Sequence, residues 1–166
     1  MKSQRMTTVK INIDGSCPSQ GTELAQAGYG VAIRGPIHED LLGRLDGSIQ
    51  DSTRAEVTSF LKAIEWLKQY PGVDATIYTD SRMVVEVVHG LLEREDSNSE
   101  ERRFWKLTKD LWHEIKQIMP DVEKRIRNVV WVDRDQNEEA NKLARRAANA
   151  LILVGRHDLP QFCKTI

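Results

Sequence analysis

The chain has 166 residues, 40% of them hydrophobic and 30% charged, and its formal net charge is -1. This length fits one domain with a buried core, and the balanced charge weakens the case for a polyanionic substrate without excluding it. No segment has the apolar length of a signal peptide or a membrane span, so we expect an intracellular protein, cytoplasmic or nuclear, that does not contact membranes. Cys17 and Cys163 lie near opposite ends, which indicates free thiols, although a disulfide between them remains open.

A first strand is predicted to end in a carboxylate. Apolar and polar residues alternate from Val9 to Asp14, so that Asp14 shares a strand face with Lys10 and Asn12. Gly15 then allows the backbone to turn. Asp14 is either a solvated turn residue or an acid that meets a metal ion at the strand end, and this segment alone favours the turn.

A second strand is predicted over residues 27–33. Its large side chains share one face, whereas Gly28 and Gly30 leave the other face nearly bare. The bare face allows a packed helix or another partner to approach closely. A third strand around Leu41–Leu45 would pair back on the second and complete an antiparallel meander.

The first helix is predicted to begin at Thr53-Arg54-Ala55-Glu56, which fits a capping box, and to run to about Tyr70. Glu56 therefore has two interpretations. It can return a hydrogen bond to the backbone N–H of Thr53, or it can lie as an acid near the sheet edge where Asp14 ends. The spacing of the residues does not decide between them.

A fourth strand over residues 75–80 repeats the pattern of the first, because it ends in Asp80 followed by Ser81. Alone, Asp80 would be interpreted as a helix N-cap. Two strands that both end in an Asp before a small residue, with Glu56 at the start of the helix between them, instead predict a group of carboxylates. The repulsion among these carboxylates must be relieved.

The second half of the chain is predicted to contain one further strand among helices. A charged loop over residues 93–103 precedes an amphipathic helix that ends at Pro120, and its aromatic residues are assigned to the core. A last strand over residues 128–132 leads into a helix whose alanines permit close packing on a sheet. The segment beyond Val154 is predicted to be an irregular appendage or a loosely docked extension.

Four segments, in this order, resemble the motifs of type 1 ribonuclease H: Ile13-Asp14-Gly15-Ser16, Thr53-Arg54-Ala55-Glu56, Tyr78-Thr79-Asp80-Ser81 and Asn137-Glu138-Glu139-Ala140-Asn141-Lys142-Leu143-Ala144. The resemblance implies an α/β, ribonuclease H-like domain over residues 1–152 and a C-terminal tail over residues 153–166. Its sheet would have five strands, with an antiparallel meander of strands 1–3 joined to parallel strands 4 and 5, and would be flanked by helices.

The resemblance also implies the chemistry. Asp14, Glu56 and Asp80 match three catalytic, metal-binding carboxylates of the family, and the fourth falls at Asn141. The implied reaction is hydrolysis of the RNA strand of an RNA–DNA hybrid with two Mg²⁺ ions, for which Mn²⁺ can substitute. One ion helps to generate the attacking hydroxide and the other stabilises the leaving 3′ oxygen. Asn141, natural or introduced, offers an oxygen without a charge, so we expect one weakened metal site and largely intact hybrid binding.

Other expected contacts follow from the same resemblance. Residues near the site are predicted to bind the hybrid, partly through 2′-hydroxyl groups: Gly15, Ser16, Ser52, Thr53, Arg54 and Ser81. The bare face of the second strand could also help the hybrid to approach. Residues 92–96 are mixed in charge where several members carry a basic protrusion, so the candidates for phosphate contacts are Lys10, Arg82, Arg145 and Arg146. A polymerase or another hybrid-binding protein could then be the partner of this chain, which we expect to be a monomer.

Two features support a different hypothesis, a catalytically silent ribonuclease H-like module that binds or tethers nucleic acid. One is Asn141, and the other is the lack of a histidine over residues 132–136, where many members carry one. Asp133 or Asp135 could supply the missing charge, although both precede the last helix. The presence of Asp14, Glu56 and Asp80 argues against the silent module.

Overall fold

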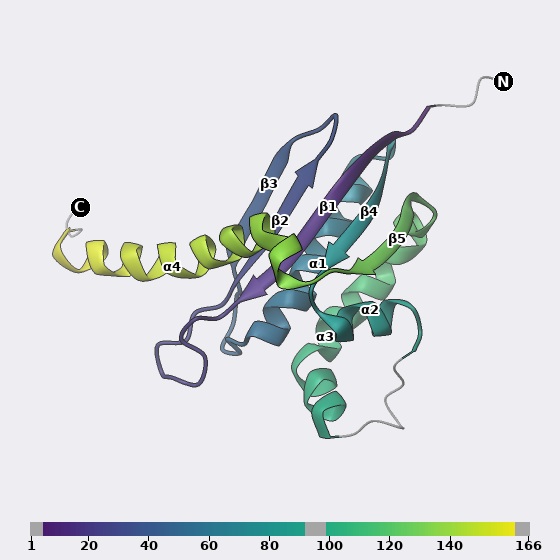
Figure 1. Cartoon of the computed structure of the whole chain (residues 1–166). Helices are drawn as coiled ribbons and strands as arrows, with labels where there is room; N and C mark the ends of the chain where they lie inside the picture. Colours follow the sequence, from purple (N-terminus) through teal and green to yellow (C-terminus); the bar gives the residue numbers. More distant parts are fainter. Residues whose placement is uncertain (1–4, 92–98, 162–166) are drawn as a thin grey trace.

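A computed structural model of the chain describes residues 5–91 and 99–161, with side chains as far as residue 149. Five strands form one mixed sheet in the order β3-β2-β1-β4-β5 (Figure 1). The strands are β1 (Thr7–Ser16), β2 (Gly28–Arg34), β3 (Glu39–Arg44), β4 (Val73–Thr79) and β5 (Ile126–Trp131). The first three pair antiparallel, whereas β4 runs parallel to both β1 and β5. The predicted fold class is confirmed.

Helices cover both faces of this sheet (Figure 1). They are α1 (Ser52–Gln69), α2 (Arg82–Val88), α3 (Ser99–Val122) and α4 (Glu138–Gln161), with short 3-10 helices η1 (Glu123–Arg125) and η2 (Arg134–Asn137). The main core lies between the sheet and α1 with α3, where Ile11, Ile13 and Ile77 are buried with Phe60 and Ile64. Because side chains alternate along β1, Asp14 lies on the opposite face, which α4 covers.

The bare face of β2 receives α4. A Cβ atom on Gly28 would lie 2.6 Å from the carbonyl oxygen of Ala144, and one on Gly30 would lie 2.5 Å from that of Ala140. Only glycine permits this approach, and the small residues of α4 complete it. The packed-helix interpretation is therefore confirmed, and the idea that this face helps a hybrid to approach is wrong.

The helix starts differ from two predictions. Asp51, not Thr53, caps α1, because its side chain accepts hydrogen bonds from the backbone nitrogens of Thr53 and Arg54. Thr53 lies inside the helix, so Glu56 does not close a capping box. Likewise Ser81, not Asp80, caps α2 by accepting from the nitrogen of Val84. Neither Glu56 nor Asp80 therefore has a capping role.

Helix lengths differ as well. Helix α3 begins at Ser99, within the predicted loop, and continues past Pro120 to Val122, so this proline lies inside the helix, where it removes one backbone hydrogen bond. Helix α4 continues to Gln161, so the prediction of an irregular segment beyond Val154 is wrong over this range. The division at residue 152 stays a prediction. Residues 92–96 and Cys163 lie outside the described residues, and Cys17 is a free, buried thiol.

None of the helices in the described part of the chain combines the length and apolar character that a membrane span requires.

Candidate active site

The carboxyl end of β1 packs directly against the first turns of α1. A Cβ atom on Gly15 would collide with the backbone of Ala55 and Glu56, so no residue with a side chain fits there. This close approach brings Glu56 next to Asp14. The Gly15 backbone N–H donates to the Asp14 Oδ1 at 2.9 Å, which fixes one oxygen of that carboxylate.

Asp80 reaches the same place from β4. Strands β1 and β4 are parallel, and their pairing ends at Ile13 and Thr79, so the residues that follow, Asp14 and Asp80, lie together at the carboxyl end of this strand pair. One carboxylate oxygen from each of Asp14, Glu56 and Asp80 lies within 4.8 Å of the others. Among the described residues this is the only group of three or more acidic, histidine or cysteine side chains close enough to share a metal ion.

The electrostatics of this group are unfavourable without a cation. Burial raises the pKa of Glu56 from 4.5 to about 8, and the charges of Asp14 and Asp80 add to the shift. Burial and the charge of Asp80 raise the pKa of Asp14 from 3.8 to about 6. No Lys or Arg of the described chain forms an ion pair with any of the three acids. Acids that are buried or half-buried together without an ion-pair partner favour protons or a metal ion.

Asn141 completes the group from α4. Its Nδ2 donates to the Asp14 Oδ2 at 2.7 Å, and this hydrogen bond lowers the pKa of Asp14 against the effect of burial. The position predicted from the motif therefore lies beside the acids. An aspartate there would add a fourth negative charge, whereas the amide of Asn141 donates a hydrogen bond and stabilises the charged form of Asp14.

A cavity of about 500 Å³ opens above these side chains. Besides the four residues of the group, it is lined by Gly15, Ser16, Cys17, Pro18, Ser52, Arg134, Arg145 and Asn149. The cavity therefore combines carboxylates with hydroxyl groups and two arginines. This composition is suited to a ligand that carries both hydroxyl groups and negative charge.

The RNase H family model matches residues 6–149. The chain belongs to the RNase H family. A comparison of its sequence with curated proteins gives no match.

Solved structures share the RNase H fold at low sequence identity. The N-terminal RNase H domain of a Mycobacterium tuberculosis protein, solved as a fusion with maltose-binding protein, has a TM-score of 0.66 at 19% identity, covering 90% of this chain and 99% of that one. LC11-RNase H1 in complex with an RNA/DNA hybrid has a TM-score of 0.61 at 19% identity, covering 87% and 99%. The foamy viral protease-reverse transcriptase in complex with an RNA/DNA hybrid has a TM-score of 0.64 at 16% identity, covering 90% of this chain and 21% of that one.

The predicted hybrid-binding residues of this chain fall into two groups, those that line the cavity and those that do not. Gly15, Ser16 and Ser52 line the cavity. Thr53 and Arg54 do not, and the Arg54 guanidinium is engaged on the far side of α1 by Asp110 at 2.7 and 2.8 Å. Ser81 is the buried cap of α2.

The candidate phosphate contacts also differ in whether they line the cavity. Arg145 lines the cavity, whereas Arg146, the next residue, does not. Arg82 stacks 4.2 Å from the ring of Trp131, whose Nε1 donates to the Asp80 carbonyl oxygen at 3.1 Å. Lys10 lies 4.8 Å over the ring of Tyr78.

The acids before α4 do not replace the missing charge. The Asp133 side chain accepts from the Gln136 nitrogen and caps η2, and neither Asp133 nor Asp135 belongs to the acidic group or to the described lining of the cavity.

Sequence reasoning missed a buried pair of amides that holds α4 on β1. The Asn137 Nδ2 donates to the Ile13 carbonyl oxygen at 2.8 Å, and its Oδ1 accepts from the Asn12 Nδ2 at 2.9 Å. Asn137 lies one helical turn before Asn141, so this contact sets the distance between Asn141 and Asp14. The one available signal was Asn12, a polar residue on the same strand face as Asp14, but its partner is 125 residues away.

Proposed function

We propose that this RNase H is a metal-dependent endoribonuclease that hydrolyses the RNA strand of RNA–DNA hybrids. The observation that carries the proposal is the convergence of Asp14, Glu56 and Asp80 from three separate elements, where none of them forms an ion pair with a Lys or Arg of the described residues. The family supports the reaction class. The hybrids bound to LC11-RNase H1 and to the foamy viral enzyme support the substrate class.

The donor set fits hard divalent cations. Carboxylate oxygens are the ligands that Mg²⁺ prefers, and the raised pKa values of Asp14 and Glu56 mark acids that a cation would relieve. Asp14, Glu56 and Asp80 would hold two Mg²⁺ ions, or Mn²⁺ in their place, with the side-chain oxygen of Asn141 as a weaker ligand. When bound, the ions supply charge stabilisation to the phosphoryl group and lower the pKa of water.

The chain's own residues position the site and its substrate. The amide of Asn141 and the backbone N–H of Gly15 orient the two oxygens of Asp14. The hydroxyl groups of Ser16 and Ser52 line the cavity, where they could accept or donate to ribose 2′-hydroxyl groups and so distinguish RNA from DNA. We expect the chain to be a monomer to which a polymerase or another hybrid-binding partner would add affinity, as the foamy viral neighbour includes a reverse transcriptase in one chain.

A second function, the catalytically silent binding module, is favoured by one contact. Asn141 presents its amide hydrogens, not an oxygen, to Asp14. A site organised in this way needs the amide to rotate before it can serve as a metal ligand.

Cleavage assays on three substrates test the proposal. We expect the chain to cut the labelled RNA strand of a hybrid in Mg²⁺, to leave duplex DNA and duplex RNA intact, and to lose activity in EDTA. Hybrid binding without cleavage in either Mg²⁺ or Mn²⁺ would reject the nuclease and support the silent module. Cleavage of duplex DNA at a similar rate would reject the substrate class.

A further inference from the structure

Two arginines share the cavity with the acids and pair with none of them. Arg134 comes from η2 and Arg145 from α4, and both side chains are exposed. In the described part of the chain neither guanidinium takes part in an ion pair. By contrast Arg34, Arg54 and Arg103 are all paired with carboxylates. The cavity therefore holds two guanidinium groups that are available to an anion.

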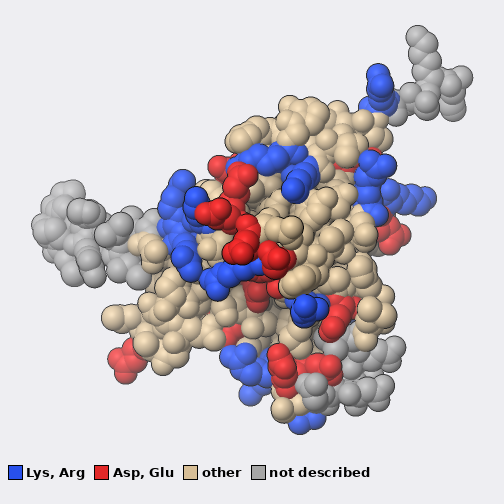
Figure 2. Space-filling view, in the orientation of Figure 1, with Lys and Arg blue, Asp and Glu red and all other residues tan. Residues whose placement is uncertain are grey.

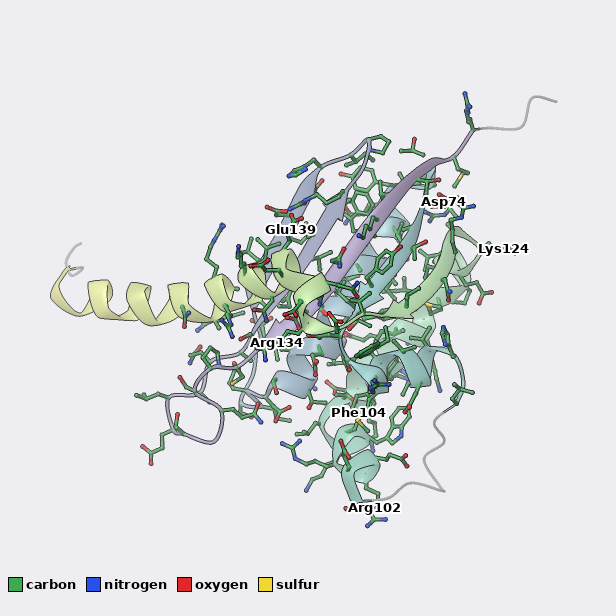
Figure 3. All side chains as sticks on the ribbon, viewed as in Figure 1. Asp74, Arg102, Phe104, Lys124, Arg134 and Glu139 are labelled. Carbon is green, nitrogen blue, oxygen red and sulfur yellow. The ribbon has the colours of Figure 1, made fainter. Side chains whose placement is uncertain are left out.

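The positions of the two arginines bracket Asn141. Asn141, Arg145 and Asn149 are spaced by four residues, so they share one face of α4 over about 12 Å. Arg134 lies before the first turn of α4, close to the end of β1, whereas Glu139 lies on the side of the helix toward β2 (Figure 3). Polar side chains therefore form a row from Arg134, past the acidic group, to Asn149.

The charge of this face is locally mixed although the chain is nearly neutral. Figure 2 shows Lys and Arg side chains gathered along α4, next to a group of Asp and Glu side chains. Three carboxylates would repel a phosphate diester, and a net charge of -1 provides no general attraction for one. Binding of a nucleic-acid backbone at this cavity therefore depends on cations that lie in the cavity itself.

We propose that Arg134 and Arg145 form a phosphate clamp, which binds the nucleic-acid backbone on both sides of the carboxylate group. Guanidinium groups suit this role because their planar donors match two phosphate oxygens at once. Asn149 adds a polar contact at the far end of the row. The nature of the polyanion, an RNA–DNA hybrid, rests on the proposed function.

The clamp is tested by binding, without metal and without reading cleavage. The affinity of the full chain for a fluorescently labelled hybrid is measured by anisotropy in EDTA at several salt concentrations. We expect Arg134→Gln and Arg145→Gln each to weaken binding roughly three- to tenfold, and to reduce the slope of log affinity against log salt by about one. Both residues are exposed, and equal melting temperatures would confirm that the variants fold.

The adjacent Arg146 provides a matched control. Arg146→Gln removes the same charge from the next position of α4, outside the cavity, and is expected to change affinity less than about twofold. Arg145→Lys should keep most of the salt slope but not the full affinity, because a lysine cannot donate in the same fork. Equal losses for Arg145→Gln and Arg146→Gln, an unchanged salt slope, or no binding of hybrid by the wild type would overturn the clamp.

The phosphate clamp and the proposed nuclease activity can be rejected independently of each other. If the clamp variants lose binding while the wild type cuts no hybrid, the clamp stands and the proposed reaction is rejected. If the wild type cuts hybrid while the clamp variants bind it as well as the wild type, the reaction stands and the clamp is rejected.

Discussion

The acidic side chains on the two sides of the start of α1 differ in whether a cation neutralises them. On one side, Arg54 binds Asp110 of α3 through two hydrogen bonds, which hold the pKa of Asp110 below its ordinary value. On the other side, two residues along, burial and neighbouring acids raise the pKa of Glu56 to about 8. Even the buried cap Asp51 has a cation, Arg103, at 2.9 Å. The acids that hold the helices together are neutralised, whereas the acids at the sheet edge are not.

This difference separates stability from function. A carboxylate that is removed from water without a cationic partner lowers the stability of the folded state, and the chain nevertheless brings carboxylate oxygens of buried Asp14 and half-buried Glu56 and Asp80 within 4.8 Å of one another. Function accounts for such a group, because a cation supplied from solution relieves the repulsion. The two kinds of acid should therefore respond differently to substitution and to pH.

The largest effect is expected from removing one acid of the group. Asp80→Asn should reduce Mg²⁺-dependent hybrid cleavage by about a thousandfold, because a metal ligand is lost, and should raise the melting temperature in EDTA, because repulsion decreases. Asp110→Asn is the matched control and should cut hybrid at the wild-type rate. Cleavage by Asp80→Asn within a few fold of the wild type would contradict the assignment.

The pH dependence of stability should reveal the raised pKa values. Glu56 contributes its full stability below its ordinary pKa of 4.5, and this contribution is lost as the pH rises to about 8. The metal-free protein should therefore lose on the order of a few kcal/mol of unfolding free energy between pH 5 and 8. Urea denaturation at both pH values measures the loss, which Mg²⁺ should restore and Glu56→Gln should largely abolish. Stability that rises with pH in EDTA would oppose this account.

The buried amide pair should contribute to stability in its own right. Asn137→Ala removes the hydrogen bond to the Ile13 carbonyl oxygen and leaves the Asn12 amide only its 3.5 Å hydrogen bond to the Gln136 carbonyl oxygen, so a loss of about 1–3 kcal/mol in unfolding free energy is expected. A double-mutant cycle with Asn12→Ala measures the coupling, and the double variant should lose less than the sum of the single losses. Additive losses would show that the two amides do not act together.

A smaller effect is expected from restoring the fourth acid. Asn141→Asp should increase cleavage about tenfold at limiting Mg²⁺, because it adds a charged ligand, and should leave hybrid binding in EDTA nearly unchanged. Rates measured across a Mg²⁺ titration test this, and the gain should shrink as Mg²⁺ approaches saturation. Equal rates for both proteins at all concentrations would refute the idea that Asn141 weakens a metal site.

The smallest effect is expected at Asp110, which Arg54 neutralises. The Asp110 side chain is 65% exposed, so Asp110→Asn should cost less than about 1 kcal/mol. Its pH dependence has the opposite sign to that of Glu56, because the pKa of Asp110 is lowered and its contribution is lost as the pH falls. Thermal unfolding at pH 3 and 7 compares wild type and variant. A larger loss at pH 3 than at pH 7 would contradict the ion pair.

The sequence predicts elements well where one local pattern determines them. The residue patterns of β1 and β4 locate both strands, although β1 continues past the expected end at Asp14 because Gly15 and Ser16 still pair with β2. The arrangement of the strands in the sheet came from the resemblance to ribonuclease H, and the order of the elements agrees with it. Helix caps were harder to predict, because Asp51 and Thr53 are both good capping residues. Only the backbone conformation decides which one lies outside the helix. The continuation of α3 through Pro120 likewise depends on packing that a local rule does not include.

Contacts between distant residues limited the prediction of the site. Motif order places Asn141 beside Asp14, and the structure agrees. No local pattern pairs Arg54 with Asp110, so a residue expected to meet the substrate proved to be held by α3. Arg134 was missed for the same reason, because its flanking acids suggest a solvated loop until the start of α4 is placed over β1.

The release of protons on metal binding tests the central claim most directly. Mg²⁺ is titrated into the protein by calorimetry at pH 7, in two buffers with different ionisation enthalpies. Glu56, with a pKa of about 8, holds its proton at this pH, so binding should release about one proton per chain, and Glu56→Gln should release almost none. Mg²⁺ binding without proton release, or no binding of Mg²⁺ by the acidic group, would contradict the account.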